Sequence, residues 1–299
     1  MPTKAERERM ERLMKSKAYI RAYEDVGFLG REDLRPVRLQ LELLKAEVML
    51  QEQKIDSTIV VFGSTRTVER KDIEPVVRRL EAKQRTAPQD ARVAEDLAVA
   101  RRLLAKSRYY DEAREFARLV SSTCQRDGRC DYVIVTGGGP GIMEAANRGA
   151  YDVGAKTVGL NITLPHEQSP NSYITPDLSF QFHYFALRKM HFLMRAKAMV
   201  IFPGGYGTLD ELFEALTLVQ TGKVKGLPVI LFGREWWTKL INWTYLRDEG
   251  VIAKEDLNLF RFAESAAEAW TKIRNYYRKK GGGFGSLDRP SLLGGKSEG

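Results

Sequence analysis

The regular alternation of short apolar strands with amphipathic helices is the feature that most limits what this chain can fold into. Six apolar, often β-branched runs are predicted as strands, at residues 57–64, 131–139, 155–162, 198–205, 227–233 and 257–264. Segments with apolar residues at helical spacing lie between them. This order predicts an α/β fold in which helices cover both faces of a parallel sheet.

Three parts follow from the same pattern. Residues 1–56 are predicted to form a charged, helical N-terminal extension, and residues 57–279 the α/β domain. A charged region near 70–125 is predicted to be a helical insertion in that domain. The glycine-rich segment 280–299 is predicted to be a flexible tail.

The chain of 299 residues carries a net charge of +9, which raises the question of nucleic-acid binding. Its basic residues alternate with acidic ones along helical stretches such as KAERERMERLMK. Such mixing is typical of solvated helix faces, so we expect no nucleic-acid partner. A mildly basic surface would still attract a small phosphorylated substrate.

Composition also argues against several other classes of protein. No apolar run approaches the roughly 20 residues of a membrane helix, and the charged N-terminus lacks the apolar core of a secretory signal. Cys124 and Cys130 are too few for a disulfide framework or a four-cysteine zinc site. The three histidines show no metal-binding spacing. We therefore expect a cytoplasmic protein with no metal site and no membrane partner.

Three of the predicted strands end in glycine-containing loops: VVFGSTR, VIVTGGGPG and VIFPGGYGT. In a doubly wound sheet, ligands bind beyond the carboxyl ends of the strands, near the point where the strand order reverses. The three loops are therefore the predicted location of the ligand site.

The loop VIVTGGGPGIME resembles a dinucleotide-binding fingerprint but departs from it in detail. Counting G-x-G-x-x-G from Gly137 places Ile142 where the third glycine belongs, and no acidic residue ends the following strand. No P-loop motif is present in the sequence either. Residues 137–141 thus have two open interpretations, a tight turn or a contact with substrate.

The stretch PGGYGTLDE is more specific. Three glycines allow close backbone approach and positive φ angles, and Thr208 is predicted at the N-cap of the next helix, where an anion would bind. A capping box, T-x-x-E, would explain Thr208 and Glu211 without a ligand. It would not explain the three glycines, or the pair Arg188–Lys189 in the preceding helix.

Together, GGGPGIMEAA, ALRKM and PGGYGTLDELFE resemble the LONELY GUY (LOG) family over roughly residues 57–275. These proteins are cytokinin riboside 5'-monophosphate phosphoribohydrolases, often mislabelled as lysine decarboxylases. The resemblance implies a Rossmann-like, doubly wound fold and hydrolysis of the N-glycosidic bond of AMP or an N6-substituted AMP. It also implies a homo-oligomer with sites near the subunit interface. The chain is similar to the longer bacterial variants of the family.

By motif position, the resemblance implies that Glu211 and Arg188 are the catalytic pair. Two further groups follow from it. The phosphate loop would consist of Gly204, Gly205, Gly207 and Thr208. Other contacts to substrate would come from Lys189, Glu167, Ser64, Gly138 and Gly139.

Cleavage of the bond between a purine and ribose creates positive charge on the sugar, which a carboxylate stabilises. We therefore expect the helix start to bind the 5'-phosphate while Glu211 faces the ribose. Arg188 is expected to orient Glu211 or the ribose and keep the carboxylate ionised. Asp210 and Glu214 are expected to be ordinary acidic residues of the first turn. One of the aromatic residues Phe180, Phe182, Tyr184 and Phe185 could stack on the purine.

Two other functions remain open. The fold could serve a non-hydrolytic protein that binds a nucleotide or the molybdenum cofactor, or the N-terminal helices could serve assembly. Lysine decarboxylation is not expected, because Lys189 comes with no signature of a pyridoxal phosphate site; no cofactor is predicted. Whether the base is adenine or prenylated adenine stays open.

Overall fold

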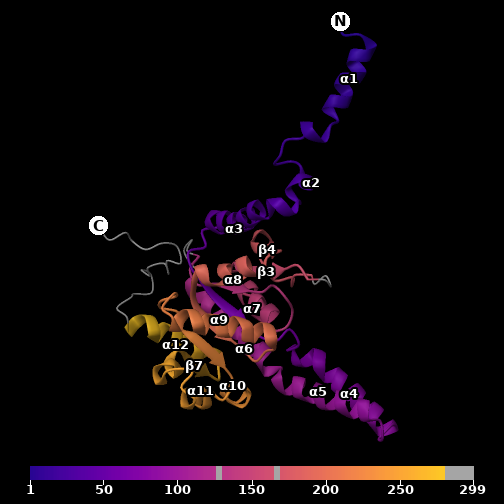
Figure 1. Ribbon diagram of the computed structural model, residues 1–299. Helices are drawn as coiled ribbons and strands as arrows, with labels where there is room; N and C mark the ends of the chain where they lie inside the picture. The colour runs from indigo at the N-terminus through magenta and orange to yellow at the C-terminus, as the bar shows by residue number, and fades with distance from the viewer. Residues whose placement is uncertain (126–129, 165–168, 280–299) are drawn as a thin grey trace, which may run out of the picture. The chain divides into compact units, whose positions relative to one another are not determined.

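Seven parallel strands form one central sheet in the computed structural model, which describes residues 1–125, 130–164 and 169–279 (Figure 1). The strands are β1 (Thr58–Phe62), β2 (Val133–Thr136), β3 (Thr157–Ile162), β4 (Ser179–Phe182), β5 (Ala196–Ile201), β6 (Val229–Phe232) and β7 (Phe260–Ala263). Their order is β4-β3-β2-β1-β5-β6-β7, and every neighbouring pair is parallel. The predicted parallel sheet is confirmed.

The sequence reading missed β4. This strand lies at the edge of the sheet and pairs only with β3. Its four residues SFQF alternate between exposed and buried, so it lacks the continuous apolar run that marked the inner strands.

Helices occupy the connections between strands, as predicted. The α-helices are α1 (Lys4–Met14), α2 (Val26–Leu29), α3 (Arg35–Glu52), α4 (Arg70–Thr86), α5 (Ala91–Lys106), α6 (Arg108–Cys124), α7 (Ile142–Tyr151), α8 (Phe185–Met194), α9 (Tyr206–Gln220), α10 (Arg234–Leu240), α11 (Trp243–Asp248) and α12 (Ala266–Lys279). Short 3-10 helices span Lys17–Tyr19, Glu32–Leu34, Pro176–Leu178 and Lys254–Asn258.

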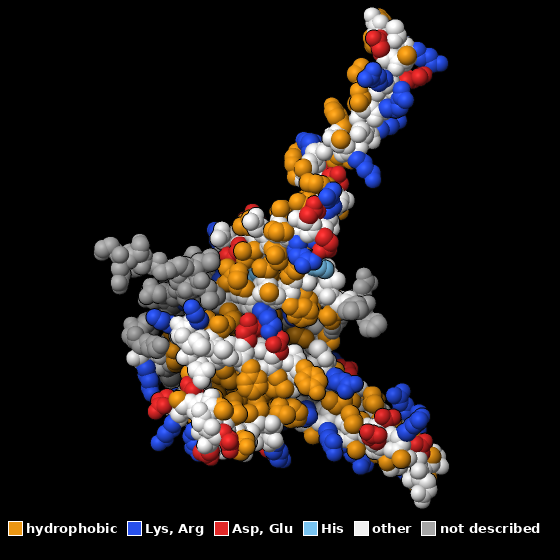
Figure 2. Space-filling view, in the orientation of Figure 1, with side chains coloured by type: hydrophobic (Ala, Val, Ile, Leu, Met, Phe, Trp, Pro, Cys, Tyr) orange, Lys and Arg blue, Asp and Glu red, His pale blue; other side chains and the backbone are white. Residues whose placement is uncertain are grey.

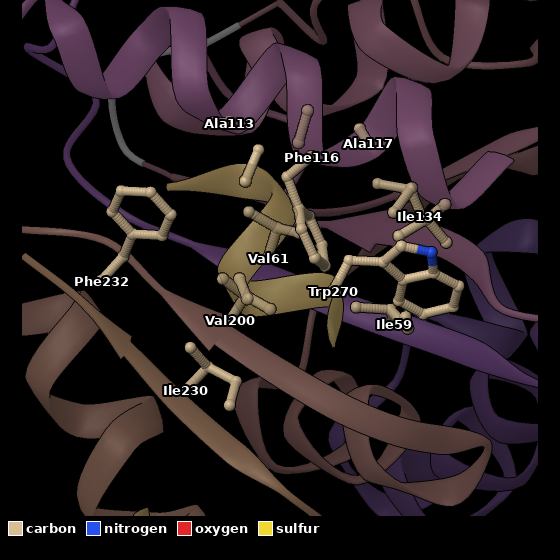
Figure 3. Packing of buried hydrophobic residues seen from close by; sticks show 14 of the residues in the cluster. Ile59, Val61, Ala113, Phe116, Ala117, Ile134, Val200, Ile230, Phe232 and Trp270 are labelled. Atoms are coloured by element: carbon tan, nitrogen blue, oxygen red, sulfur yellow. The ribbon is translucent and has the colours of Figure 1, made fainter. Parts of the chain in front are cut away.

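Alternate residues of β1 point to opposite faces of the sheet, and both faces are covered. Ile59 and Val61 belong to a core cluster that α6, α7 and α12 complete, with Phe116 and Trp270 among its largest side chains (Figure 3). On the other face, the ring of Phe62 packs edge-on against Phe192 of α8, with the ring centroids 4.6 Å apart. The fold is therefore a Rossmann-like, doubly wound α/β fold.

Strand β1 lies at the centre of the sheet, and the chain order reverses beside it. The chain runs outward from β1 to β4 on one side and then returns to form β5, β6 and β7 on the other. The loops after β1 and β5 consequently leave the sheet side by side, where the amide of Ser64 donates a hydrogen bond to the carbonyl of Pro203 at 3.0 Å. This is the switch point at which the fold binds ligands.

The region near 70–125 divides into two parts. Helices α4 and α5 form a hairpin in which Arg101 and Glu81 form an ion pair at 2.8 Å (Figure 1). Figure 2 shows acidic and basic side chains mixed over this hairpin. Helix α6 instead belongs to the layer that covers the sheet, with Ala113 and Phe116 fully buried.

The chain forms two compact units, Met1–Val48 and Met49–Gly299. In the first, a capping box between Thr3 and Glu6 begins α1, and the Arg38 guanidinium donates a hydrogen bond to the carbonyl of Leu29 at 2.8 Å. The domain boundaries inferred from the sequence stay a prediction. Among the residues described, none of the helices is both long and apolar enough to span a bilayer.

Candidate functional site

A cavity of about 350 Å³ opens at the switch point. Its wall is built from the β1–α4 loop, the start of α7, helix α8 and the first two turns of α9. The lining residues are Phe62, Gly63, Ser64, Thr65, Arg66, Met143, Phe185, Arg188, Gly205, Tyr206, Gly207, Thr208, Asp210 and Glu211. The structure thus brings together both predicted catalytic residues and most of the predicted phosphate loop.

Helix α9 begins earlier than its sequence suggested. Its N-cap is Gly205, in an extended conformation (φ −94°, ψ −154°), so Thr208 is the third helical residue and the predicted N-cap position was wrong. The carbonyl of Gly205 accepts hydrogen bonds from the amides of Thr208 and Leu209, both at 3.0 Å. No capping box forms at this helix start, and Glu211 lies in the second turn.

The three glycines of the loop have two different roles, and none of them has the positive φ angle that we expected. A Cβ atom on Gly204 would lie 2.2 Å from the Thr208 hydroxyl oxygen, so this glycine makes room for the threonine. A Cβ atom on Gly205 or Gly207 would meet no protein atom within 4 Å. These two exposed glycines therefore leave the main chain at the helix start bare toward the cavity.

The amides of a helix's first residues have no partner within the helix, and in α9 these belong to Tyr206 and Gly207. Both residues line the cavity. The α9 start thus presents N–H groups and the positive end of the helix dipole to any anion inside.

Glu211 lies on the same face of α9 as Gly207 and Thr208, one turn further along. Its side chain is buried, with 6% of the residue exposed. Burial raises the pKa of Glu211 to about 7; Lys189 and Arg188 lower it, and Glu214 and Asp210 raise it. The expectation that Arg188 keeps this carboxylate ionised is therefore correct in direction, but burial outweighs it.

Arg188 projects from α8 into a largely buried position. Its Nε donates a hydrogen bond to the carbonyl of Leu160 at 2.7 Å, and its guanidinium lies over the ring of Phe192, 5.1 Å from the centroid. Gly137 makes room for it, because a Cβ atom there would lie 2.5 Å from the Arg188 Nη2. Burial lowers the pKa of Arg188, an effect that the charge of Glu211 opposes.

No ion pair within 4.0 Å joins Arg188 to Glu211 in the described part of the chain. The two groups interact through space, so a direct contact by which Arg188 would orient Glu211 is absent, and its expected contact with the ribose stays a prediction. The backbone of β3 and the ring of Phe192 hold the arginine instead.

Lys189 does not line the cavity. Its Nζ donates a hydrogen bond to Asp210 at 2.7 Å and forms an ion pair with Glu214 at 3.0 Å. The first-turn role expected for the two acids is wrong, because α9 has no acidic residue in its first turn. They hold a lysine close to Glu211 instead.

Two other predicted contacts, Gly138 and Gly139, are not among the described residues that line the cavity. The carbonyls of both accept hydrogen bonds from the side chain of Asn171 at 3.1 Å. Gly138 has a φ of +76° and leaves no room for a Cβ atom beside Asn161. Both glycines serve the turn after β2, and their contact with substrate stays a prediction.

Ser64 lies in the wall as expected, and Glu167 lies outside the described residues. Phe185 also lines the cavity and is 51% exposed, which leaves its ring available to a purine. Phe180 and Phe182 are buried in the sheet instead. Within the described ranges, no group of three His, Cys, Asp or Glu side chains could hold a metal ion.

The sequence reading missed Arg66, which lines the cavity next to Ser64 and Thr65. The available signal was its place in VVFGSTR, three residues after the glycine that ends a central strand.

Comparison with known proteins supports the LOG resemblance. Residues 143–273 match the family described as "Possible lysine decarboxylase". A probable cytokinin riboside 5'-monophosphate phosphoribohydrolase of Oryza sativa subsp. japonica, LOG4, is 28% identical over 145 residues, which are 47% of this chain and 61% of the relative. LOG1 of Arabidopsis thaliana, with the same activity in its name, is 26% identical over 148 residues, 48% of this chain and 68% of that protein.

The chain thus spans about three fifths of the length of the rice relative. A crystal structure of TM1055 is 22% identical and covers 56% of this chain and 89% of its own, with a TM-score of 0.39.

Proposed function

On the premise that this chain is a relative of the LOG-type phosphoribohydrolases, we propose that it hydrolyses the N-glycosidic bond of a purine nucleoside 5'-monophosphate. The substrate is AMP or an N6-substituted AMP of the cytokinin type. The products are the free base and ribose 5-phosphate.

One observation carries the proposal: a single cavity contains the bare start of α9 and, one helical turn further on, the buried carboxyl group of Glu211. An anion is favoured at the first position and developing positive charge at the second. A nucleoside monophosphate carries both features, since its phosphate and its glycosidic carbon are at opposite ends of the ribose.

The reaction needs no group beyond those in the cavity and water. The bond between C1' and the purine nitrogen breaks, and its electron pair leaves with the base. The ionised carboxylate of Glu211 stabilises the positive charge that develops on the ribose. It then accepts a proton as water adds to C1' and later releases it to solvent, while the departing base takes up a proton from solvent at a ring nitrogen, so that one water molecule is consumed overall.

The pKa of Glu211, about 7, suits this role. A carboxyl group with an ordinary pKa is a weak base at neutral pH, whereas one that titrates near the working pH accepts a proton more readily. Arg188 and Lys189 each favour the ionised form, so they supply the charge that partly offsets burial.

The environment of Lys189 does not suit the lysine decarboxylase activity that the family description names. A lysine that forms a Schiff base needs a neutral amine directed at its ligand. The Lys189 ammonium group instead binds Asp210 and Glu214, and these contacts raise its pKa. The described residues that line the cavity include no lysine.

Incubation of the purified protein with AMP, and separately with N6-isopentenyl-AMP, tests the proposal. We expect release of base and ribose 5-phosphate in equal amounts from at least one of the two. Tight binding of both nucleotides without product would instead favour a non-hydrolytic binding protein.

A further inference from the structure

Two acidic residues line a cavity that must also accept a phosphate. The carboxyl groups of Asp210 and Glu211 are both in the wall, so a phosphate dianion needs nearby positive charge to offset them. The described cations of the wall are Arg66 and Arg188.

Of these two, Arg188 is already engaged. Its side chain is half-buried, its Nε donates a hydrogen bond to the carbonyl of Leu160, and its guanidinium lies over the ring of Phe192. Lys189 is also engaged, because it neutralises Asp210 and Glu214 from outside the cavity. Arg188 thus acts on Glu211 through space from a fixed position, and the charge of Lys189 is taken up by Asp210 and Glu214.

Arg66 differs from both. It is exposed, and its guanidinium makes no hydrogen bond or ion pair with any residue that the structure describes. Its only polar contact there is through the backbone, where its amide donates a hydrogen bond to the Ser64 hydroxyl at 3.0 Å. An unpartnered arginine in the wall of a cavity is available to a ligand.

The loop that carries Arg66 is fixed on both sides. The amide of Ser64 is bonded to the carbonyl of Pro203, and its carbonyl accepts from the amide of Ile142 at 3.1 Å. Further along, Thr67 is buried, and Glu69 accepts a hydrogen bond from Arg148 at 2.6 Å. The loop therefore holds the backbone of Arg66 in place before any ligand arrives.

The bond from Ser64 to Pro203 also sets the position of this loop relative to α9. Pro203 comes directly before the glycines of the phosphate loop, so Arg66 and the bare amides of Tyr206 and Gly207 belong to adjoining parts of one wall. A phosphate bound at the helix start would meet the main chain of α9 on one side and the β1–α4 loop on the other.

We propose that Arg66 binds the 5'-phosphate together with the start of α9, and so makes the site select nucleoside monophosphates over nucleosides. This inference rests on the proposed function. A guanidinium group suits the task, because it stays charged and donates two parallel hydrogen bonds to phosphate oxygens.

The test compares three variants of the full chain. Arg66→Ala removes the charge, and Arg66→Lys keeps it without the planar fork. Arg70→Ala is the matched control, because Arg70 is an exposed arginine four residues further on that does not line the cavity. Calorimetric titration gives the Kd for ribose 5-phosphate, and kinetics with AMP and adenosine give kcat and KM.

We expect Arg66→Ala to weaken ribose 5-phosphate binding and raise KM for AMP by about 10- to 100-fold, the usual range for one lost charge-assisted hydrogen-bonding partner. Its kcat for AMP and its activity toward adenosine should change little. Arg66→Lys should be intermediate, and Arg70→Ala should match the wild type.

Two results would overturn the inference. One is a Kd for ribose 5-phosphate in Arg66→Ala equal to that in Arg70→Ala. The other is a change in the preference between AMP and N6-isopentenyl-AMP at unchanged ribose 5-phosphate affinity, which would place Arg66 at the base. If the wild type releases no base from either nucleotide, the proposed function fails, and the ribose 5-phosphate titration still decides on Arg66.

Discussion

Lys189 of α8 donates a hydrogen bond to Asp210 of α9 at 2.7 Å, directly beside the residue that carries the proposed chemistry. The lysine also binds Glu214, and its charge lowers the pKa of Glu211. The Lys189 ammonium group thus interacts with three carboxyl groups. It pairs directly with Asp210 and Glu214, whereas Glu211 lines the cavity without a direct ion pair.

Removing this cation should move the pH dependence of the reaction. In Lys189→Met the three acids repel one another, so we expect the pKa of Glu211 to rise and the acid limb of the kcat/KM profile to move up by about one pH unit. Lys239→Met, which removes an exposed lysine paired with Glu235, is the control. A midpoint that stays in place would show that Lys189 does not act on Glu211.

The wild type should lose activity on the acid side of neutrality. Glu211 must be ionised to stabilise the sugar, and its pKa of about 7 means that the ionised fraction falls as the pH decreases through that value. We expect kcat/KM for AMP to decrease about tenfold per pH unit below the midpoint. The substrate's own phosphate titrates near pH 6, so the profile is compared with that of ribose 5-phosphate binding.

Adding a methyl group at Gly207 should separate binding from folding. A Cβ atom there meets no protein atom, and the φ angle is not positive, so Gly207→Ala should leave the free energy of unfolding unchanged or raise it by up to about 1 kcal/mol. The methyl group would stand in the cavity, and affinity for AMP should fall about tenfold or more. Chemical denaturation and nucleotide titration measure the two effects.

Gly204→Ala is the contrasting variant. Here the methyl group meets the Thr208 hydroxyl, so stability should fall together with affinity. Equal nucleotide affinity in Gly207→Ala and the wild type would show that no ligand approaches this part of the helix.

Burial of Glu211 should cost stability at neutral and alkaline pH. Its pKa is about 7 in the folded chain against 4.5 for an ordinary glutamate, so between these values the folded state binds the extra proton and stability falls as the pH rises. At about 1.4 kcal/mol per pKa unit, the loss is about 3 kcal/mol.

The uncharged isostere Glu211→Gln does not titrate. Its free energy of unfolding relative to the wild type should therefore increase by about 2 to 3 kcal/mol between pH 5 and pH 8. Glu249→Gln, at an exposed position, should show no such trend. A constant difference across this range would mean that Glu211 is not buried as described.

The alternation of apolar runs with amphipathic segments was sufficient to predict the fold. Inner parallel strands are continuous apolar runs, and the helices between them are amphipathic. Edge strand β4 was not predicted, because only half of its residues are buried and it has no continuous apolar run. The start of α9 was misplaced because Thr208 and Glu211 fit a capping box, whereas the extended backbone of Gly205 begins the helix three residues earlier.

Contacts between distant segments could not be read from spacing. The packing of Arg188 under Leu160, the bond from Lys189 to Asp210 and the approach of the β1–α4 loop to Pro203 all depend on how helices and loops meet across the sheet. The sequence showed which residues could act. It did not show that burial would dominate the pKa of Glu211, or that Arg66 would face the same cavity.

The most direct measurement is the turnover of AMP by Glu211→Gln beside the wild type, with nucleotide affinity measured in parallel. The proposed role predicts release of ribose 5-phosphate by the wild type, and in the variant a kcat lower by about 100-fold or more with the Kd changed less than about threefold. Near-wild-type turnover in Glu211→Gln would contradict it, because the charge at this position would then have no part in breaking the bond.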